Sequence, residues 1–167
     1  MGETPFICGG YGETYGDFYD DCYKYIAASD EWVNSGYMSE KRVYSGYGSS
    51  EKWGLVMAGG WSQTPFYEDA LSSVETSYNG ETFTSLPDMP GLNGDSCLVV
   101  IDDDRIFTCG GHPNTRENIT GTLIFTESTN TWNKYDYTSY FLHGQVGLEN
   151  FIDLTGLQKY LIISNMQ

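Results

Sequence analysis

One short phrase, an apolar run that ends in two glycines, occurs three times in the sequence at a nearly constant interval. The phrases FICGG, LVMAGG and IFTCGG end at Gly10, Gly60 and Gly111, so the pair recurs after 50 and then 51 residues. A fixed period of this length is typical of repeat proteins, in which each repeat hides its apolar face against its neighbours. The chain is therefore expected to consist of similar units packed side by side.

Other landmarks keep the same period and order. A polar loop and a second apolar run follow each double glycine: CYKYI at 22–26, VETSY at 74–78 and TLIFT at 122–126. A bulky aromatic residue comes next in each copy, and a methionine follows the first two aromatics. These positions are Trp32, Phe83 and Trp132 for the aromatics and Met38 and Met89 for the methionines.

The composition favours strands joined by tight turns. Glycine and tyrosine are abundant, at 20 and 14 residues, and glycine suits turns while tyrosine suits strands. Three aspartates, 102–104, separate the runs CLVVI and RIFTC and predict a hairpin turn there, and GSSEK at 48–52 is the expected turn of the preceding copy. We expect no helix and predict strands near 5–9, 21–26, 30–33, 43–47, 53–58, 73–78, 82–85, 97–101, 105–109, 122–126, 130–134, 147–154 and 159–165.

The period, the double glycine and the later aromatic together resemble the kelch repeat. Kelch repeats carry an aromatic on the strand after the double glycine and a Trp about seven residues later, and Tyr25 with Trp32 and Phe125 with Trp132 match this spacing. The middle copy departs, with Phe83 only five residues after Tyr78. Arg42 matches an arginine that many kelch repeats carry, whereas Asn93 stands near the corresponding place in the next copy.

The resemblance implies an all-β fold, namely a partial kelch-type β-propeller of about three to four four-stranded antiparallel blades. The whole chain, 1–167, would be a single propeller segment with approximate repeats 1–47, 48–97 and 98–146 and a partial repeat 147–167. In such a propeller the glycines let the backbone pass where a Cβ would collide or take a positive φ, and the Trp and Phe residues wedge between blades.

About three and a half repeats are fewer than most propellers contain, since these have roughly four to eight blades. Three explanations stay open. The chain is a piece of a longer kelch protein, or its first and last strands pair within one composite blade, or two chains associate through their open blade edges, as unpaired edge strands invite.

The four cysteines fall at positions suited to two disulfides. The hairpin register across the aspartate turn places Cys97 opposite Cys109, and Cys8 and Cys22 lie on neighbouring strands of one blade. Directly opposed residues of antiparallel strands are about 4.5–5.5 Å apart, within disulfide range. Four buried free thiols are the alternative. With the glycosylation sequon at Asn118, the pairing favours an extracellular over a cytoplasmic location.

The charge balance restricts the partners. The chain has 8 Lys and Arg against 23 Asp and Glu, a net charge of -15. Nucleic acids and anionic membranes are recognised through cationic side chains, so neither is expected as a partner. No apolar run approaches the roughly 20 residues of a membrane-spanning helix. The acidic surface suits a protein partner, and a basic one in particular.

The sequence offers no evident catalytic or metal-binding constellation. His112 and His143 are the two histidines, and the acidic group Asp17, Asp20 and Asp21 reads as a solvated loop. We therefore expect a non-catalytic protein–protein interaction module without a cofactor. The alternative is a fragment of a propeller enzyme, either carbohydrate-active or galactose-oxidase-like, which predicts a bound metal or glycan.

The expected binding surface is the set of loops that follow the double glycines, 10–21, 60–72 and 111–121. Binding residues concentrate on loops of a rigid scaffold, and Tyr and Trp are frequent at interaction hot spots. The alternative is that several of these rings cap the blades. The candidate binding residues are Tyr11, Tyr15, Phe18, Trp61, Phe66, Tyr67 and His112.

Overall fold

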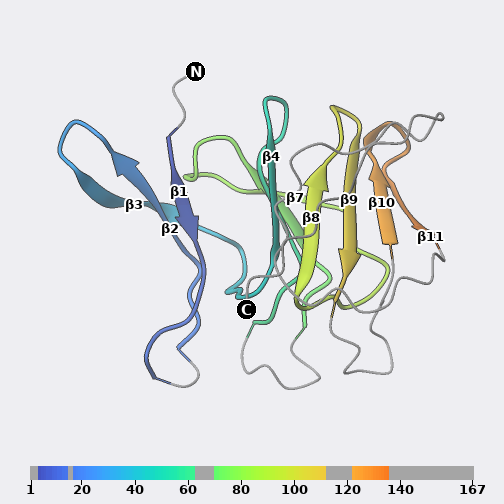
Figure 1. Ribbon diagram of the computed structural model, residues 1–167, viewed down its shortest axis with the longest axis horizontal. Coiled ribbons are helices and arrows are strands. Elements are labelled where there is room, and N and C mark those ends of the chain that lie inside the picture. Colours follow the sequence, from blue (N-terminus) through green and yellow to red (C-terminus); the bar gives the residue numbers. More distant parts are fainter. Residues whose placement is uncertain (1–3, 15–16, 63–69, 112–121, 136–167) are drawn as a thin grey trace.

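The computed structural model is all-β, as expected, and its strands form three antiparallel sheets (Figure 1). It describes residues 4–14, 17–62, 70–111 and 122–135, to which all structural statements below refer. Within these ranges helix is limited to one 3-10 turn, η1 (Glu127–Thr129). The strands are β1 (Phe6–Cys8), β2 (Asp21–Ile26), β3 (Glu31–Tyr37), β4 (Gly46–Ser50), β5 (Gly54–Ala58), β6 (Val74–Ser77), β7 (Thr84–Leu86), β8 (Ser96–Val100), β9 (Arg105–Gly110), β10 (Thr122–Thr126) and β11 (Thr131–Tyr135).

Each sheet is a meander in which strands that follow one another in the chain are neighbours. Sheet 1 has the order β1-β2-β3, sheet 2 the order β4-β5-β6-β7 and sheet 3 the order β8-β9-β10-β11. The three sheets stand next to one another in chain order, and β4 of sheet 2 lies against β8 of sheet 3 (Figure 1). None of the three closes on itself, and the predicted strands 147–154 and 159–165 lie outside the described residues.

The glycine-serine run before residue 51 is where the strand prediction was wrong. The sequence predicted a strand at 43–47 and a turn at 48–52, but residues 46–50 form β4 and the turn comes at 51–53. The reason is a close approach between sheets. A Cβ on Gly46 would lie 2.8 Å from the Cβ of Leu98 in β8, so small residues are required in this strand rather than in a turn.

The double glycines form the same joint in the first and second copies. Gly9 and Gly59 have φ values of 67° and 64°, and a Cβ on either would lie 2.3 Å from the carbonyl oxygen of Arg42 or 2.1 Å from that of Asn93. The N–H of the following glycine donates to the same carbonyl oxygen, at 2.9 Å and 2.8 Å respectively. Both the expected positive φ and the expected close approach are thus confirmed. The joint ties the end of one sheet to the segment that enters the next.

The aromatic pairs also recur. Tyr25 lies directly opposite Trp32, with ring centroids 5.4 Å apart, and Phe125 lies opposite Trp132 at 5.3 Å. In sheet 3 this pair packs against sheet 2, where the Trp132 indole N–H donates to the carbonyl of Pro87 at 2.7 Å. The equivalent Trp32 of sheet 1 is 45% exposed. The same pair is therefore covered in one sheet and open in the other.

Apolar side chains fill both spaces between the sheets. Alternation along each strand sends every second residue to one face, so facing sheets share a core. Met38 and Met89, which keep the sequence period, are both buried, one in each space. The buried cluster between sheets 2 and 3 contains Trp53, Val56, Ala58, Val74, Met89, Leu98, Ile106, Leu123 and Phe125, and that between sheets 1 and 2 contains Cys22, Met38 and Met57 with Cys8, Tyr47, Leu55 and Phe83 against them.

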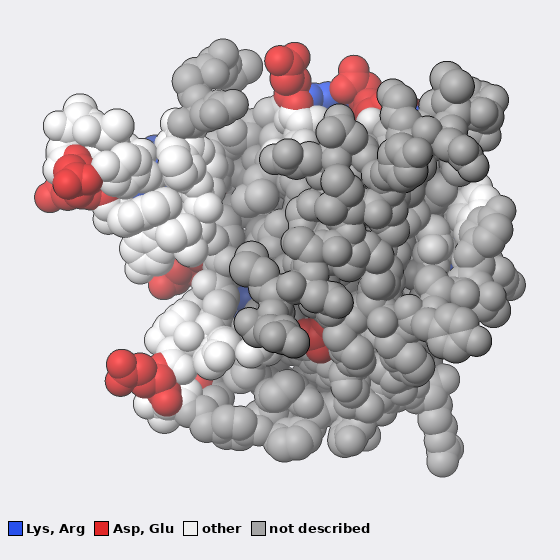
Figure 2. Space-filling model, viewed as in Figure 1, with Lys and Arg blue, Asp and Glu red and all other residues white. Residues whose placement is uncertain are grey.

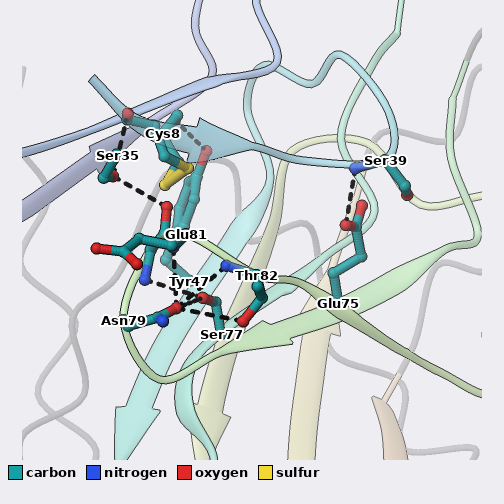
Figure 3. The surroundings of a disulfide bond; sticks show 11 residues. Cys8, Ser35, Ser39, Tyr47, Glu75, Ser77, Asn79, Glu81 and Thr82 are labelled. Atoms are coloured by element: carbon teal, nitrogen blue, oxygen red, sulfur yellow. Dashed lines mark hydrogen bonds between the residues drawn. A yellow bond between two sulfur atoms is a disulfide. The ribbon is translucent and has the colours of Figure 1, made fainter.

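Polar contacts reinforce the space between sheets 1 and 2 (Figure 3). The hydroxyl of Ser35 lies within hydrogen-bond distance of the carbonyl oxygens of Cys22, at 3.1 Å, and Gly80, at 2.9 Å, and thereby links β3 to the β6–β7 turn. The phenol of Tyr47 in β4 donates to the Cys8 carbonyl at 3.3 Å. These bonds satisfy backbone carbonyls at the junction of the two sheets.

Two disulfides close the inner hairpins of sheets 1 and 3. Cys8 is bonded to Cys22 across β1 and β2, and Cys97 to Cys109 across β8 and β9; in both hairpins the bonded residues are direct cross-strand partners. Both favoured pairings are therefore present. Cys8 and Cys109 each stand next to a double glycine. The disulfides fix the strand register beside a double glycine in each hairpin.

The aspartates of the third copy occupy the predicted turn. Asp102 accepts a hydrogen bond from the Asp104 N–H at 2.9 Å and forms an ion pair with Arg105 at 2.6 Å. The Arg105 guanidinium is the main reason why the pKa of Asp102 lies below its ordinary value of 3.8. Asp104 accepts from Ser128 in η1, so the turn is also joined to the outer half of its own sheet.

Candidate functional site

The two ends of the sheets differ in character (Figure 1). The hairpin turns, at 51–53, 78–83 and 101–104, lie at the end drawn at the top, which we call the hairpin rim. The segments that follow the double glycines leave the sheets at the opposite end, which we call the loop rim. The loop rim is where the sequence placed the binding surface.

The predicted aromatic residues of the loop rim have different environments. Tyr11 is 61% exposed, as a contact residue would be. Phe18 and Trp61 are buried, at 7% and 2%, in a cluster with Val43 and Ala70, so their expected exposure was wrong. Trp61 exchanges two backbone hydrogen bonds with Val43, at 2.9 and 3.0 Å, and its ring lies against Gly94, just before β8.

These two rings are therefore buried within the protein, whereas Tyr11 is open to solvent. The remaining candidates cannot be placed in the same way. Tyr15, Phe66, Tyr67, His112 and the sequon residue Asn118 lie outside the described residues, as does His143.

Tyr44 is a surface residue of the loop rim that the sequence did not single out. It is 42% exposed, and its ring centroid lies 5.9 Å from that of Tyr11, with the ring planes at 50°. Its φ of 53° is left-handed, which costs a bulky residue about 1–2 kcal/mol. The equivalent residue of the next copy, Asp95, has a φ of 57°, and aspartate tolerates this conformation. The tyrosine thus stands where the fold suits a small polar residue.

Asp95 lies beside this tyrosine. Its N–H donates to the carbonyl of Tyr44 at 3.1 Å, and its carboxylate Oδ2 accepts from the Trp61 indole at 3.3 Å. We call Tyr11, Tyr44 and Asp95 the tyrosine cluster. A hydrogen bond with the Tyr11 side chain, then burial and the charge of Asp95, raises the pKa of Tyr44. The phenol of Tyr44 is therefore neutral at physiological pH.

The buried ion pair between Arg42 and Glu75 is the other unusual electrostatic feature. Their side chains are 0% and 1% exposed and lie 2.5 Å apart. Arg42 also donates to the Gly59 carbonyl at 2.9 Å and the Ser73 hydroxyl at 3.0 Å. The second oxygen of Glu75 accepts the Ser39 N–H at 3.0 Å (Figure 3). Both charges are enclosed and paired, so the pair ties the connector that leads from sheet 1 to sheet 2 onto β6 and is not a reactive centre.

An open groove of about 310 Å³ lies at the hairpin rim between sheets 2 and 3. Lys52 crosses it, forms an ion pair with Glu127 and donates to the Asp103 carbonyl at 2.7 Å. The amide oxygen of Asn79 accepts two turn N–H groups, from Glu81 and Thr82. The main polar groups of the groove are thus occupied by one another. Its lining is Lys52, Trp53, Thr76, Ser77, Tyr78, Asn79, Thr82, Thr84, Leu86 and Glu127.

The surface is acidic where it is described. Figure 2 shows Asp and Glu side chains at several separate places on this face, with few Lys or Arg between them. Lys24, Arg42, Lys52 and Arg105 are each engaged in an ion pair. Much of the sparse positive charge is therefore neutralised within the molecule.

Within the described ranges no group of three or more His, Cys, Asp or Glu residues is arranged to hold a metal ion, and the acidic residues 17, 20 and 21 are no exception. The same part of the chain includes no helix long and apolar enough to cross a membrane. No protein-family model matches the chain, and no curated protein matches it significantly.

Proposed function

We propose that the three sheets are blades of a kelch-like β-propeller, and that the chain acts as a non-catalytic module that binds a protein partner. The support for the propeller is the repeated construction: consecutive meanders, the same glycine joint in two copies and the same aromatic pair in two sheets. Propeller blades hide their faces only against neighbouring blades, as sheets 2 and 3 do here.

The loop rim is the proposed binding surface, and one observation carries this. Tyr44 keeps a large ring partly in solvent in a conformation that disfavours it, next to the more exposed ring of Tyr11. Strain of this kind persists mainly at functional sites, and tyrosine is a frequent hot-spot residue. A partner that packs on these rings would account for both features.

The proposed partner is basic, and the proposed location is extracellular. A net charge of -15 steers positively charged proteins toward the molecule and repels acidic ones. Disulfides such as the two present here persist in oxidising compartments. Secreted basic proteins are accordingly the first class to test.

Site-specific photo-crosslinking tests the proposed surface. A photoreactive phenylalanine analogue is placed at Tyr11 and, as the control, at Tyr37, which is 62% exposed at the end of β3. In medium or extract of the source cells, the Tyr11 position should give one discrete adduct with a basic protein, which excess unlabelled protein removes. The same adducts at both positions would refute the loop-rim assignment. A bound glycan or metal with no protein adduct would favour the propeller-enzyme alternative.

The open face of sheet 1 indicates where the proposed propeller would be completed by a further blade. Trp32 is exposed where its counterpart Trp132 is covered by another sheet, so we propose that a further sheet packs on this face. Sedimentation of the wild type and of Trp32→Lys identifies its source. A mass of two chains that the substitution reduces to one would show self-association. A single-chain mass for both proteins would exclude a second copy.

A further inference from the structure

We propose that the tyrosine cluster at the loop rim binds one cationic side chain, an arginine or lysine, of the basic partner. This inference rests on the proposed function and makes it specific: it assigns the group that is recognised and the three residues that recognise it.

The first support is the position of Tyr44 within the repeat. The residue two places after Arg42 and the residue two places after Asn93 have nearly the same backbone conformation, yet one is Tyr and the other is Asp. The fold therefore accepts a residue without a ring here, and the ring of Tyr44 stays 42% exposed. A tyrosine at this place has a use outside the fold, because backbone strain without a folding benefit marks functional positions.

The second support is the chemistry that the cluster offers. A cation is attracted to the face of an aromatic ring when it lies within about 6 Å of the centroid. The centroids of Tyr11 and Tyr44 are 5.9 Å apart, so a cation over the exposed side of the pair can lie within that distance of both rings. Oδ1 of Asp95 accepts no hydrogen bond from any described residue, whereas Oδ2 holds Trp61. One carboxylate oxygen is thus left for an N–H donor.

The third support is the rigidity of the site. Asp95 is fixed by its bond to the Tyr44 carbonyl and by the buried indole of Trp61. Tyr44 lies between Val43 and Ser45, which are both buried. Little side-chain and backbone freedom is lost on binding such a preorganised site. The negative field of the whole molecule adds a preference for a cation over a neutral sugar, the other ligand that stacks on tyrosine.

The test uses three variants and two controls. Tyr44→Gly, Tyr11→Ala and Asp95→Asn remove the groups of the cluster. Tyr37→Ala removes an exposed tyrosine elsewhere, and Glu51→Gln removes one exposed acidic charge at the hairpin rim. Binding of fluorescent nona-arginine is measured by anisotropy at low and moderate salt, and neutral maltoheptaose serves as the sugar probe. Thermal midpoints are recorded for every protein.

We expect each ring removal to weaken nona-arginine binding about two- to five-fold, the usual size of a cation–π contact at an exposed site, with no change for Tyr37→Ala. Asp95→Asn should weaken binding more than Glu51→Gln, although both remove one charge. Tyr44→Gly should keep or raise the thermal midpoint, since glycine adopts a positive φ freely. A variant that loses affinity without losing stability cannot be dismissed as misfolded.

The outcomes separate the two proposals. If the wild type binds nona-arginine and the cluster variants bind it equally well, the assignment of the cation site is wrong while a basic partner remains supported. If the wild type does not bind the peptide even at low salt, the basic-partner proposal fails with it. Binding of maltoheptaose that the cluster variants abolish, with nona-arginine binding unchanged, would assign the rings to a sugar instead. A fall in the thermal midpoint of Tyr44→Gly would overturn the strain premise.

Discussion

Breaking the buried ion pair between Arg42 and Glu75 should be among the most damaging single changes in the molecule. Replacing Glu75 by Leu leaves the guanidinium of Arg42, which is 0% exposed, without its carboxylate partner. An uncompensated buried charge costs about 3–5 kcal/mol. The cost of Glu75→Leu falls at the lower end, because Arg42 keeps its bond to the Gly59 carbonyl and lies 3.7 Å from the half-exposed Glu40.

Removing the arginine and keeping the glutamate should lower the free energy of unfolding by more. Arg42→Asn leaves the Glu75 carboxylate buried with the Ser39 N–H as its one remaining described donor, so we place its cost near 5 kcal/mol. The protein also contains a natural counterpart of the double variant, in which both charged residues are replaced. At the equivalent positions one repeat further along the chain stand Asn93 and Leu123, both buried. The two repeats thus differ at both positions together. The double variant Arg42→Asn/Glu75→Leu should lower the free energy of unfolding by about 1–3 kcal/mol, mainly because carbonyl groups lose their donors.

Urea unfolding followed by tryptophan fluorescence measures all four proteins, with the free energy of unfolding taken by linear extrapolation. Glu51→Ala, an exposed change, is the control and should stay within about 0.5 kcal/mol of the wild type. The double variant should lose at least about 2 kcal/mol less than the sum of the two single losses. Strictly additive losses, or a cost below about 1 kcal/mol for Glu75→Leu, would refute the view that the two charges are buried and coupled.

Three further outcomes follow from the fold. Gly59→Ala should lower the thermal midpoint more than Gly10→Ala, because both have a positive φ but a Cβ meets a carbonyl oxygen at 2.1 Å in the first and open space in the second. The pKa of Asp102 measured by NMR should lie below 3.8 and should rise in Arg105→Gln. Because this pKa is lowered in the folded state, the ion pair stabilises the fold above about pH 4. That stabilisation is lost as the pH falls through the lowered pKa. Replacing both cysteines of the β8–β9 disulfide with alanine should cost about 3 kcal/mol in urea unfolding, because the bond closes a loop of 12 residues.

The fold could be predicted best from residue patterns that are compatible with only a few backbone conformations. Paired glycines after a strand, two cysteines symmetric about an aspartate turn and a Trp seven residues after an aromatic each allow few conformations. From them the all-β fold, most strand positions and the two disulfides could be predicted. These features depend on local backbone geometry and on cross-strand register, which can be inferred from the order of residues in the sequence.

The candidate site was less predictable, because exposure depends on neighbouring segments. Trp61 and Phe18 looked like surface residues in polar loops, yet backbone pairing with Val43 draws the ring of Trp61 inward. Tyr44 was missed because a left-handed φ leaves no mark on an isolated tyrosine. Aligning RVYSG at 42–46 with NGDSC at 93–97 sets Tyr44 against Asp95 and would have flagged it.

The glycine joint has a consequence for how such a chain can change over evolutionary time. At both joints the bond runs from a glycine N–H to a main-chain carbonyl oxygen, and that carbonyl belongs to Arg42 in one copy and to Asn93 in the next. The connection between units therefore requires the glycines but not a particular side chain at the acceptor residue. Duplication or loss of about fifty residues would preserve every joint that remains, whereas gain or loss of a single strand would not. The number of units can thus vary more freely than the number of strands within a unit. The residues at the loop rim can meanwhile diversify in one unit at a time.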